Sequence, residues 1–567
     1  MNSKLVNIDY IIFLIYFLIV AGYGYWIYQR KKKGSMDTKD FFLAEGSLTW
    51  WAIGASLIAS NISAEQFIGM SGNGFFVGIA VAAYEWLAAI SLIIIAIWFM
   101  PVYLKNKIFT MPQFLKTRYN ESVSLVMTIF WLFLYIFVNL TSIMFLGATA
   151  INNLTGGTNL HLVMLLLAVF AIVITLGGMK VIGYTDIIQV AVLIIGGLAT
   201  TYIALTLVSE KFGLGKDAIA GFNQLLIQAP DHFHMILDKP TAATPQAEID
   251  KYLILPGIAM YFAGQWIVNL NYWGCNQYIT QRALGADLKT ARTGILFAGF
   301  LKLLMPVIVM LPGIAAYVLY KNGSLQQEMN AGGKFLTDNA YSSILGFLPN
   351  GLKGLSLAAL TAAIVASLAG KANSISTIFT LDIYKKYIKT DASEKQMVWI
   401  GRITILAAML LSIIFTWDDL LGIGGEGGFT FIQKYTGLIS PGVFAMFILG
   451  FFWKRTTASA AIVGLITGFL LALFFNNYAP AVLGNENILY TAFPNGKGGY
   501  EIPFLIGMGW SFFFTMVAMV AVSFATGPKE NPKAFVLDKT MFKLAPNHIA
   551  MIVVTLIIIT LLYARFW

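Results

Sequence analysis

Long runs of apolar residues, separated by short polar segments, set the pattern of the whole chain. The runs are about 20 residues long, which is the length that a helix needs to cross the hydrocarbon core of a bilayer. A spanning β-strand shows only about ten residues of alternating polarity. The pattern therefore predicts an all-α polytopic membrane protein with about 14 transmembrane helices. We expect these spans at residues 8–29, 48–72, 77–103, 122–152, 160–178, 183–208, 253–280, 293–319, 352–384, 399–416, 429–451, 458–477, 500–523 and 547–565.

The composition agrees with a chain that lies in a bilayer. Hydrophobic residues make up 58% of the 567 residues, and charged residues make up only 11%. A soluble domain carries roughly 25% charged residues, so most of the surface of this protein faces hydrocarbon. The backbone polar groups of a spanning segment must then be satisfied without water, which a helix achieves within itself.

The net charge of +10 is distributed unevenly among the predicted loops. Every second loop is rich in Lys and Arg, and this set of loops holds 24 of the 37 basic residues, among them Arg118, Arg282 and Arg292. Loops rich in basic residues stay in the cytoplasm. We therefore expect a multi-pass protein of the cell (inner) membrane with both termini outside. The basic excess is a signal of topology, so we expect no nucleic-acid partner.

Several kinds of function have no support in the sequence. The single cysteine, Cys275, excludes an internal disulfide and a cysteine-based metal cluster. No phosphate-binding P-loop is present to drive ATP-dependent pumping. His232 and His234 form an H-x-H pair without other ligands nearby, so a metal site there is not favoured. We find no nucleophile–base pairing, so we expect no enzyme, and we predict no obligate protein partner.

Two of the predicted spans are interrupted by polar residues. Residues 60–66 are polar in the middle of the second span, and residues 269–274 break the apolar pattern of the seventh. Two broken helices five spans apart are typical of transporters built from inverted repeats, which bind substrate and ion at the breaks. The alternative is that these polar residues are hydrogen-bonding contacts between packed helices.

The positions of the two breaks suggest how the chain is divided. We expect an N-terminal extra span with a cytoplasmic basic loop, a first five-helix repeat, an extracellular loop, a second five-helix repeat and three peripheral spans, at residues 1–47, 48–208, 209–252, 253–453 and 454–567 respectively.

Polar and charged residues at membrane depth are the candidates for chemistry, because each one is costly there. Backbone carbonyls freed at the break near Ala59 and Ile62 suit a hard cation such as sodium. Amide, carboxylate and ammonium groups beside aromatic rings suit a sugar, whose hydroxyls both donate and accept hydrogen bonds. The residues that offer these groups are Gln66, Glu85, Asn269, Lys302 and Gln433. For each of them, an ordinary hydrogen bond between helices is the alternative.

Several segments together resemble the solute:sodium symporter family. The likeness extends from about residue 8 to residue 460, and it is strongest at residues 60–72, 84–86, 135–142, 185–190, 272–278 and 432–438. The resemblance implies a LeuT-type core of ten helices in two inverted halves, with broken helices. It also implies sodium-coupled uptake of a neutral sugar of the galactose or glucose type, with the lipid bilayer as the protein's surroundings.

The resemblance further implies roles for individual residues. Sugar contacts would come from Gln66, Glu85, Asn269, Lys302 and Gln433, with Tyr272 below the sugar as an inner gate. The outer gate would consist of Met70, Tyr84 and Phe429. Sodium would be bound by the carbonyls of Ala59, Ile62 and Ala363 and by the hydroxyl of Ser367. Asp186 would lie on the route of the ion to the cytoplasm.

Three positions depart from the pattern of the family. Ala88 replaces a serine that contacts sugar in galactose-transporting members, and Ala366 replaces one of two serines at the sodium site. Lys371 lies one turn beyond Ser367, where an uncharged residue is expected. It either pairs with Asp186 as a substitute for a cation near a second ion site, or it extends to the cytoplasmic end of its span.

Other solutes and other functions remain open at this stage. The same fold would suit another polar solute, such as myo-inositol or an acidic sugar. A sugar sensor or an ion channel on the same fold is a further alternative.

Overall fold

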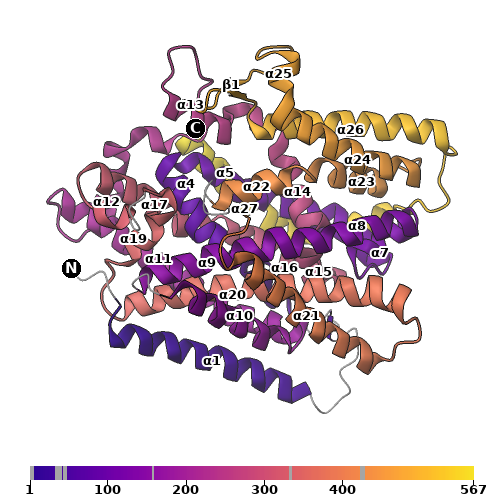
Figure 1. Ribbon diagram of the computed structural model, residues 1–567, viewed down its shortest axis with the longest axis horizontal. Coiled ribbons are helices and arrows are strands. Elements are labelled where there is room, and N and C mark those ends of the chain that lie inside the picture. Colours follow the sequence, from indigo (N-terminus) through magenta and orange to yellow (C-terminus); the bar gives the residue numbers. More distant parts are fainter. Residues whose placement is uncertain (1–4, 32–40, 43–47, 156–158, 331–334, 422–427) are drawn as a thin grey trace.

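The computed structural model describes residues 5–31, 41–42, 48–155, 159–330, 335–421 and 428–567. Most of the long helices run along the longest axis of a helical bundle, to which, within the described residues, one short hairpin adds strands (Figure 1). That hairpin pairs β1 (Phe493–Pro494) with β2 (Tyr500–Glu501) in antiparallel register.

Ten helices of the described residues are long and apolar enough to cross a membrane. They agree with ten of the predicted spans. Some consist of consecutive helical segments, such as α8 (Glu121–Phe133), η5 (Leu134–Leu140) and α9 (Thr141–Leu154). The ten are α1 (Asn7–Lys31), η3 to α6 (Ile79–Lys105), α8 to α9 (Glu121–Leu154), α11 (Met179–Lys211), α16 to α17 (Leu288–Lys321), α20 to η10 (Leu352–Ile388), α21 (Glu394–Thr416), α24 to α25 (Ala458–Leu483), α26 (Phe504–Thr526) and α27 (Pro546–Phe566).

The other four predicted spans are bent, broken or short. The seventh consists of two helical pieces, at Gln246–Phe262 and Gly264–Cys275, that meet at an angle of 83°. The second consists of α3 (Trp50–Asn61), the π-helical turn η2 (Glu65–Met70) and α4 (Ser71–Phe76). The fifth and eleventh contain the shorter α10 (Leu160–Thr175), α22 (Gly428–Gly437) and α23 (Ser440–Phe452). The total of 14 spans therefore stays a prediction.

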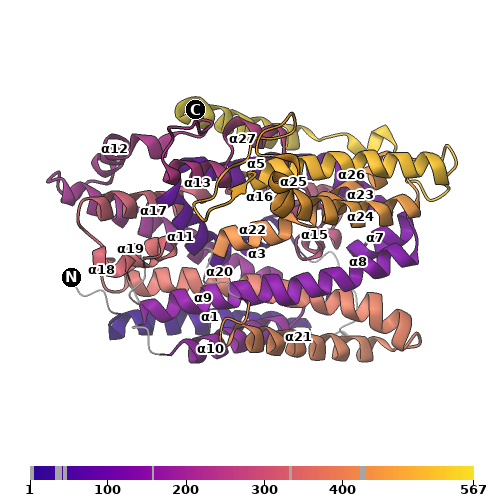
Figure 2. The same cartoon turned by 45° about the horizontal axis from the view of Figure 1, so that its top comes forward.

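Several shorter helices lie within or between these spans. They include α5 (Ala83–Ile94), α7 (Met111–Arg118), α12 (Ala218–Gln228), α13 (Gln246–Ile254), α14 (Gly264–Cys275), α15 (Gln277–Leu284), α18 (Gln326–Met329) and α19 (Ala340–Leu345). Figure 2 shows α1, α10 and α21 on one side of the bundle and α23, α24 and α26 on the opposite side. Helix α20 packs against α11, α10, α3 and α21, and its residues from Ser356 to Ile378 are all buried.

The break in the second span is confirmed. Helix α3 begins after Thr49, whose hydroxyl accepts a hydrogen bond from the amide of Ala52. It ends at Asn61, and Ile62 has extended backbone angles. The polar run interrupts the helix here because its side chains offer the backbone alternative partners: the Oε1 atom of Gln66 accepts hydrogen bonds from the amide and hydroxyl of Ser63.

The break in the seventh span is displaced from the predicted position. Residues 269–274 are helical within α14. The chain leaves the helical conformation on either side of α14, at Ala263, where the two pieces meet at 83°, and at Asn276, between α14 and α15. The polar residues here do not break the helix. The amide of Asn269 donates to the carbonyl of Gln265, and the amide of Asn271 donates to the hydroxyl of Ser440.

Three arginines of the predicted cytoplasmic loops, Arg118, Arg282 and Arg292, are buried. Arg118 donates to the carbonyls of Gly450, Trp453 and Thr456, at the C-terminal end of α23. Arg292 binds the carbonyls of Ala96, Met541 and Lys543. Arg282 lies inside the bundle. Helix C-termini expose unpaired carbonyls, so an arginine close to a span end is drawn inward as readily as outward.

Candidate functional site

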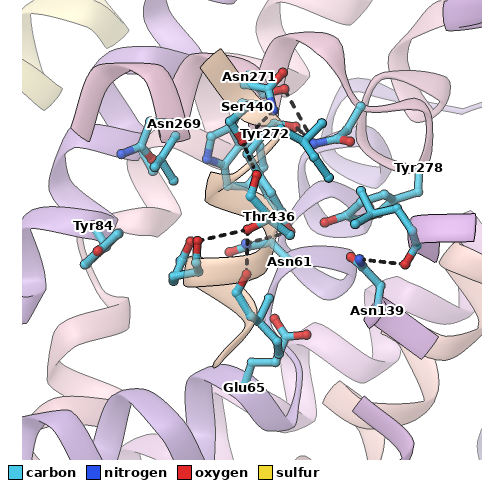
Figure 3. A pocket seen from close by; sticks show the side chains of 18 of the residues that line it. Asn61, Glu65, Tyr84, Asn139, Asn269, Asn271, Tyr272, Tyr278, Thr436 and Ser440 are labelled. Carbon is cyan, nitrogen blue, oxygen red and sulfur yellow. Dashed lines mark hydrogen bonds between the residues drawn. The ribbon is translucent and has the colours of Figure 1, made fainter. Parts of the chain in front are cut away.

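A cavity in the middle of the bundle is lined by η2, α5, α14, α16 and α22 (Figure 3). All of the predicted sugar contacts line it: Gln66, Glu85, Asn269, Tyr272, Lys302 and Gln433. These side chains come from segments more than 360 residues apart in the sequence. The fold therefore brings the polar residues of several spans into one pocket.

An ion pair between α5 and α16 forms one wall of this pocket. The ammonium of Lys302 donates hydrogen bonds to Glu85 and to Asn61, and it lies 5.2 Å from the ring centroid of Trp273. Lys302 is only 1% exposed, and Glu85 is equally well covered. The two charges compensate each other, and they present a neutral polar surface to the pocket.

The aromatic floor of the pocket is tied to the broken second span. The amide of Asn61 donates to the hydroxyl of Tyr272 over 3.0 Å. The ring of Tyr272 contacts those of Trp273 and Tyr278 edge-on, at 5.2 Å and 5.7 Å between centroids. Asn61 therefore links the end of α3 to the lysine on one side and to the tyrosine on the other.

The predicted gate residues occupy different positions. Tyr84 and Tyr272 both line the pocket. Met70 is fully buried on η2 and is not among the described lining residues. The side chain of Phe429 lies outside the described part of the chain. The gating roles of all four residues stay predictions.

The break in the second span brings three carbonyl oxygens to one hydroxyl. The Ser367 hydroxyl on α20 lies 3.4 Å from the carbonyl oxygen of Ala59, 3.0 Å from that of Ser60 and 3.4 Å from that of Ile62. A hydroxyl has only one hydrogen to donate, so the site holds more oxygen acceptors than it can satisfy. Such an excess of oxygen suits a hard cation.

The geometry of this oxygen cluster fits the predicted sodium ligands and adds one. Ala59, Ile62 and Ser367 meet as expected, and Ser60 supplies a carbonyl that the sequence did not point to. Ala363 is buried one helical turn before Ser367, on the same face of α20. Ala366, the position that departs from the family pattern, is buried beside them.

A second buried ion pair contacts α3 one turn before the oxygen cluster. The guanidinium of Arg282 is 3.6 Å from the carboxylate of Asp186, and its Nε atom donates to the carbonyl and hydroxyl of Ser56. The Ser56 hydroxyl in turn donates to Asp186 over 2.5 Å. Because Ser56 lies one turn before Ser60, this network fixes the part of α3 that leads into the break.

The structure corrects both interpretations of Lys371. Its side chain is only 2% exposed, so it does not extend to the cytoplasmic end of the span. Among the described ion pairs its partner is Glu65, at 4.0 Å, whereas Asp186 pairs with Arg282. The pairing with Asp186 was wrong because a sequence gives no measure of which of two buried acids a helical lysine faces.

Comparison with known proteins agrees with this arrangement. The model of the sodium:solute symporter family matches residues 41–468. The chain belongs to this family. A sodium/glucose cotransporter of Vibrio parahaemolyticus is 41% identical over 99% of this chain and 98% of its own length. The mouse sodium/myo-inositol cotransporter 2 is 35% identical over 82% of this chain and 69% of its own length.

A solved structure supports the fold. The substrate-bound, outward-open state of a Na⁺-coupled sialic acid symporter superposes with a TM-score of 0.74 at 21% identity. The match covers 92% of this chain and 99% of the solved one. The chain therefore has the LeuT-type fold. Because it belongs to the sodium:solute symporter family, it is a transporter rather than an enzyme.

Sequence reasoning missed several residues of the site. Asn61 lines the pocket together with Asn271, Asn276 and Tyr278. Asn269, Tyr272, Trp273 and Asn276 follow one another at helical spacing, and this periodicity was the available signal for a pocket-facing helix. Arg282 carried no such signal, because it lies close to the end of its span.

The two histidines of the H-x-H pair diverge. His232 donates to the carbonyl of Phe75, and a ring nitrogen of His234 lies 3.1 Å from the carbonyl of Trp567. Among the described residues, no group of three or more His, Cys, Asp and Glu could hold a metal ion.

Proposed function

We propose that this symporter takes up a neutral sugar of the glucose or galactose type together with sodium. One observation carries the proposal: the break in the second span contributes to both sites at once. The carbonyls of Ala59 and Ile62 face the hydroxyl of Ser367, while Asn61 and Gln66 face the pocket. An ion and a sugar that order the same short segment each raise the affinity of the protein for the other. This reciprocal effect is what coupling means in thermodynamic terms.

The chemistry of the pocket favours a neutral polyol. The charges of Glu85 and Lys302 compensate each other, so an acidic sugar would meet no free cation from this pair. The amides of Gln66, Asn269 and Gln433 offer donors and acceptors for hydroxyl groups. Ala88 also lines the pocket, at the position where galactose-transporting members have a serine. The hydroxyl of that serine is therefore missing from the surface that meets the substrate, which favours glucose over galactose.

The proposed mechanism is alternating access. Sodium binds first and orders the break, sugar then binds between the outer gate and Tyr272, and the core opens inward. Asp186 lies on the route by which sodium leaves. One charge crossing a potential of 100 mV supplies about 2.3 kcal/mol. At about 1.4 kcal/mol per factor of ten, this corresponds to roughly 40-fold accumulation of sugar.

The placement of the chain in the membrane is part of the proposal. Two five-helix repeats, at residues 48–208 and 253–453, would form the moving core. The first span and the three spans of residues 454–567 would surround it. The protein would lie in the inner membrane with both termini outside, since its basic loops belong in the cytoplasm.

Two alternatives remain, of which the first has specific support. The similarity to a sodium/myo-inositol cotransporter favours a cyclitol as the second candidate substrate. A sugar sensor or ion channel would use the same two sites without moving solute against a gradient.

Uptake into proteoliposomes tests the proposal. The purified protein is reconstituted, and labelled glucose, galactose and myo-inositol are offered with and without an inward sodium gradient. We expect glucose or galactose to accumulate only with the gradient. Accumulation of myo-inositol alone would favour the second substrate, and sodium currents without accumulation of any solute would favour the sensor or channel. Accumulation that is independent of sodium would contradict coupling.

A further inference from the structure

Lys371 is a buried lysine that the sugar pocket does not use. It lies on α20 one turn after Ser367, so its side chain emerges from the same face of α20 as the hydroxyl of the oxygen cluster. Its ammonium is 4.0 Å from the Oε1 atom of Glu65 and 4.9 Å from the ring centroid of Tyr278. Lys371 therefore connects α20 to η2, the segment that follows the break.

Glu65 is the acid that this lysine compensates. It lines the pocket from below, under Asn61 (Figure 3). Its Oε1 atom is buried and accepts no hydrogen bond from the described residues. A carboxylate buried at membrane depth needs a nearby positive charge, because removal from water costs several kcal/mol. The only ion pair that Glu65 makes within the described residues is with Lys371.

The neighbouring charges are already paired. Arg282 lies beside the chain at Gly370, next to Lys371, and it is matched by Asp186. Glu85, which also lines the pocket, is matched by Lys302. The three acids and three bases of this region therefore cancel, and removal of Lys371 would leave Glu65 as the one uncompensated charge.

We propose that the ammonium of Lys371 permanently fills a cation position beside Glu65, and that this limits the transporter to one sodium ion per sugar. A covalently attached cation cannot leave during the cycle. Glu65 is then neutralised in every state without a mobile ion, and only the site at Ser367 exchanges sodium with the two solutions. The inference rests on the proposed function, since it assigns the number of ions that the proposed symporter carries.

Direct binding of ²²Na⁺ to the purified full-length protein tests this inference without requiring transport. The variants are Lys371→Met, which keeps the length of the side chain without its charge, Lys371→Arg, which keeps the charge, and the double variant Glu65→Gln/Lys371→Met. We expect one sodium per protein for the wild type and for Lys371→Arg. We expect two for Lys371→Met, and one again for the double variant, which has no charge at either position.

Each result bears on the inference. The inference would be overturned if the wild type bound two sodium ions. It would also be overturned if Lys371→Met bound only one, including the case in which sodium binding to that variant depended on pH. Thermal melting of each variant shows whether it is folded. If Lys371→Met does not fold, the same count is made on Lys371→Gln. Wild-type protein that binds one sodium without accumulating sugar would contradict the proposed function but not this inference.

Discussion

The pair formed by Glu85 and Lys302 shows how a single buried residue depends on its partner. Replacement of one member leaves the other charge buried and unpaired, which costs about 3–5 kcal/mol. We expect Lys302→Met and Glu85→Gln each to lower the melting temperature and to abolish sugar uptake. The double variant Glu85→Gln/Lys302→Met should regain most of the stability but none of the uptake, because the polar wall of the pocket is still lost. Melting curves and proteoliposome uptake measure the two effects separately, and a double variant less stable than both single variants would contradict this account.

His232 predicts a dependence of stability on pH. It lies outside the spans, where its imidazole donates to the carbonyl of Phe75 over 3.0 Å and stacks on the ring of Tyr317. Burial lowers the pKa of His232 to about 4. Above the ordinary pKa of 6.5, both folded and unfolded chains are neutral here. As the pH falls from 6.5 towards 4, only the unfolded chain takes up the proton, so the folded state loses up to about 3 kcal/mol.

Melting curves at pH 7.5 and pH 5 test this prediction. We expect the wild type to lose more stability between these pH values than the variant His232→Gln, which does not titrate. The matched variant His234→Gln, at the exposed neighbouring histidine, should behave like the wild type. Equal losses in all three proteins would show that His232 does not titrate in this range.

Individual residues of the sugar pocket were predictable, but their partners were not. Gln66, Asn269 and Lys302 stand out because each is polar within an apolar span, and a polar side chain at membrane depth has few places to go except inward. The hydrogen bonds that hold them depend on which helices are neighbours. Arg282 shows the limit: a basic residue near the end of a span can extend to water or turn inward, and the local sequence is the same in both cases.

At the scale of one element, the broken second span leads to a prediction about sodium affinity. We expect Ser367→Ala to raise the sodium concentration for half-maximal uptake at least tenfold, because the only side-chain oxygen of the cluster is lost. The matched control is Ser60→Ala. Ser60 offers its backbone carbonyl to the cluster, while its hydroxyl donates to the carbonyl of Ser56, so sodium affinity should change little. Equal effects of the two substitutions in sodium titrations of uptake would place the ion elsewhere.

The two interruptions also show which features of an element a sequence reveals. Residues 60–66 hold five polar side chains, interrupted by Ile62 and Ala64, and helix α3 ends among them, at Asn61. Residues 269–274 are also rich in polar and aromatic side chains, yet they lie in an intact helix, from which Asn269, Tyr272 and Trp273 line the pocket. The two segments are alike in polarity, so the sequence alone did not show which of them interrupts its helix. The exact end of α14, at Cys275, depends on packing that the sequence does not show.

At the scale of the whole molecule, the fold followed from hydrophobic pattern and family resemblance together. Apolar runs located ten spans that the structure confirms, because a run of 20 apolar residues has one stable conformation in a bilayer. The number of spans was harder to predict from the sequence where a helix is bent or short. The angle of 83° in the seventh span is set by contacts between distant segments, which no local pattern records.

The orientation of the molecule is the prediction that remains at this scale, and the chain is well suited to its test. Its single cysteine, Cys275, is buried, so a new surface cysteine can be labelled selectively. Lys216, before α12, and Asp391, before α21, are both exposed and lie in loops predicted on opposite sides of the membrane.

We expect a membrane-impermeant maleimide to label Lys216→Cys in intact spheroplasts, and to label Asp391→Cys only in inside-out vesicles. The wild type is the control for labelling of Cys275, and detergent-solubilised samples show that both new thiols are reactive. The reverse pattern would mean that the basic loops face outward, which would contradict the orientation on which inward sugar transport rests.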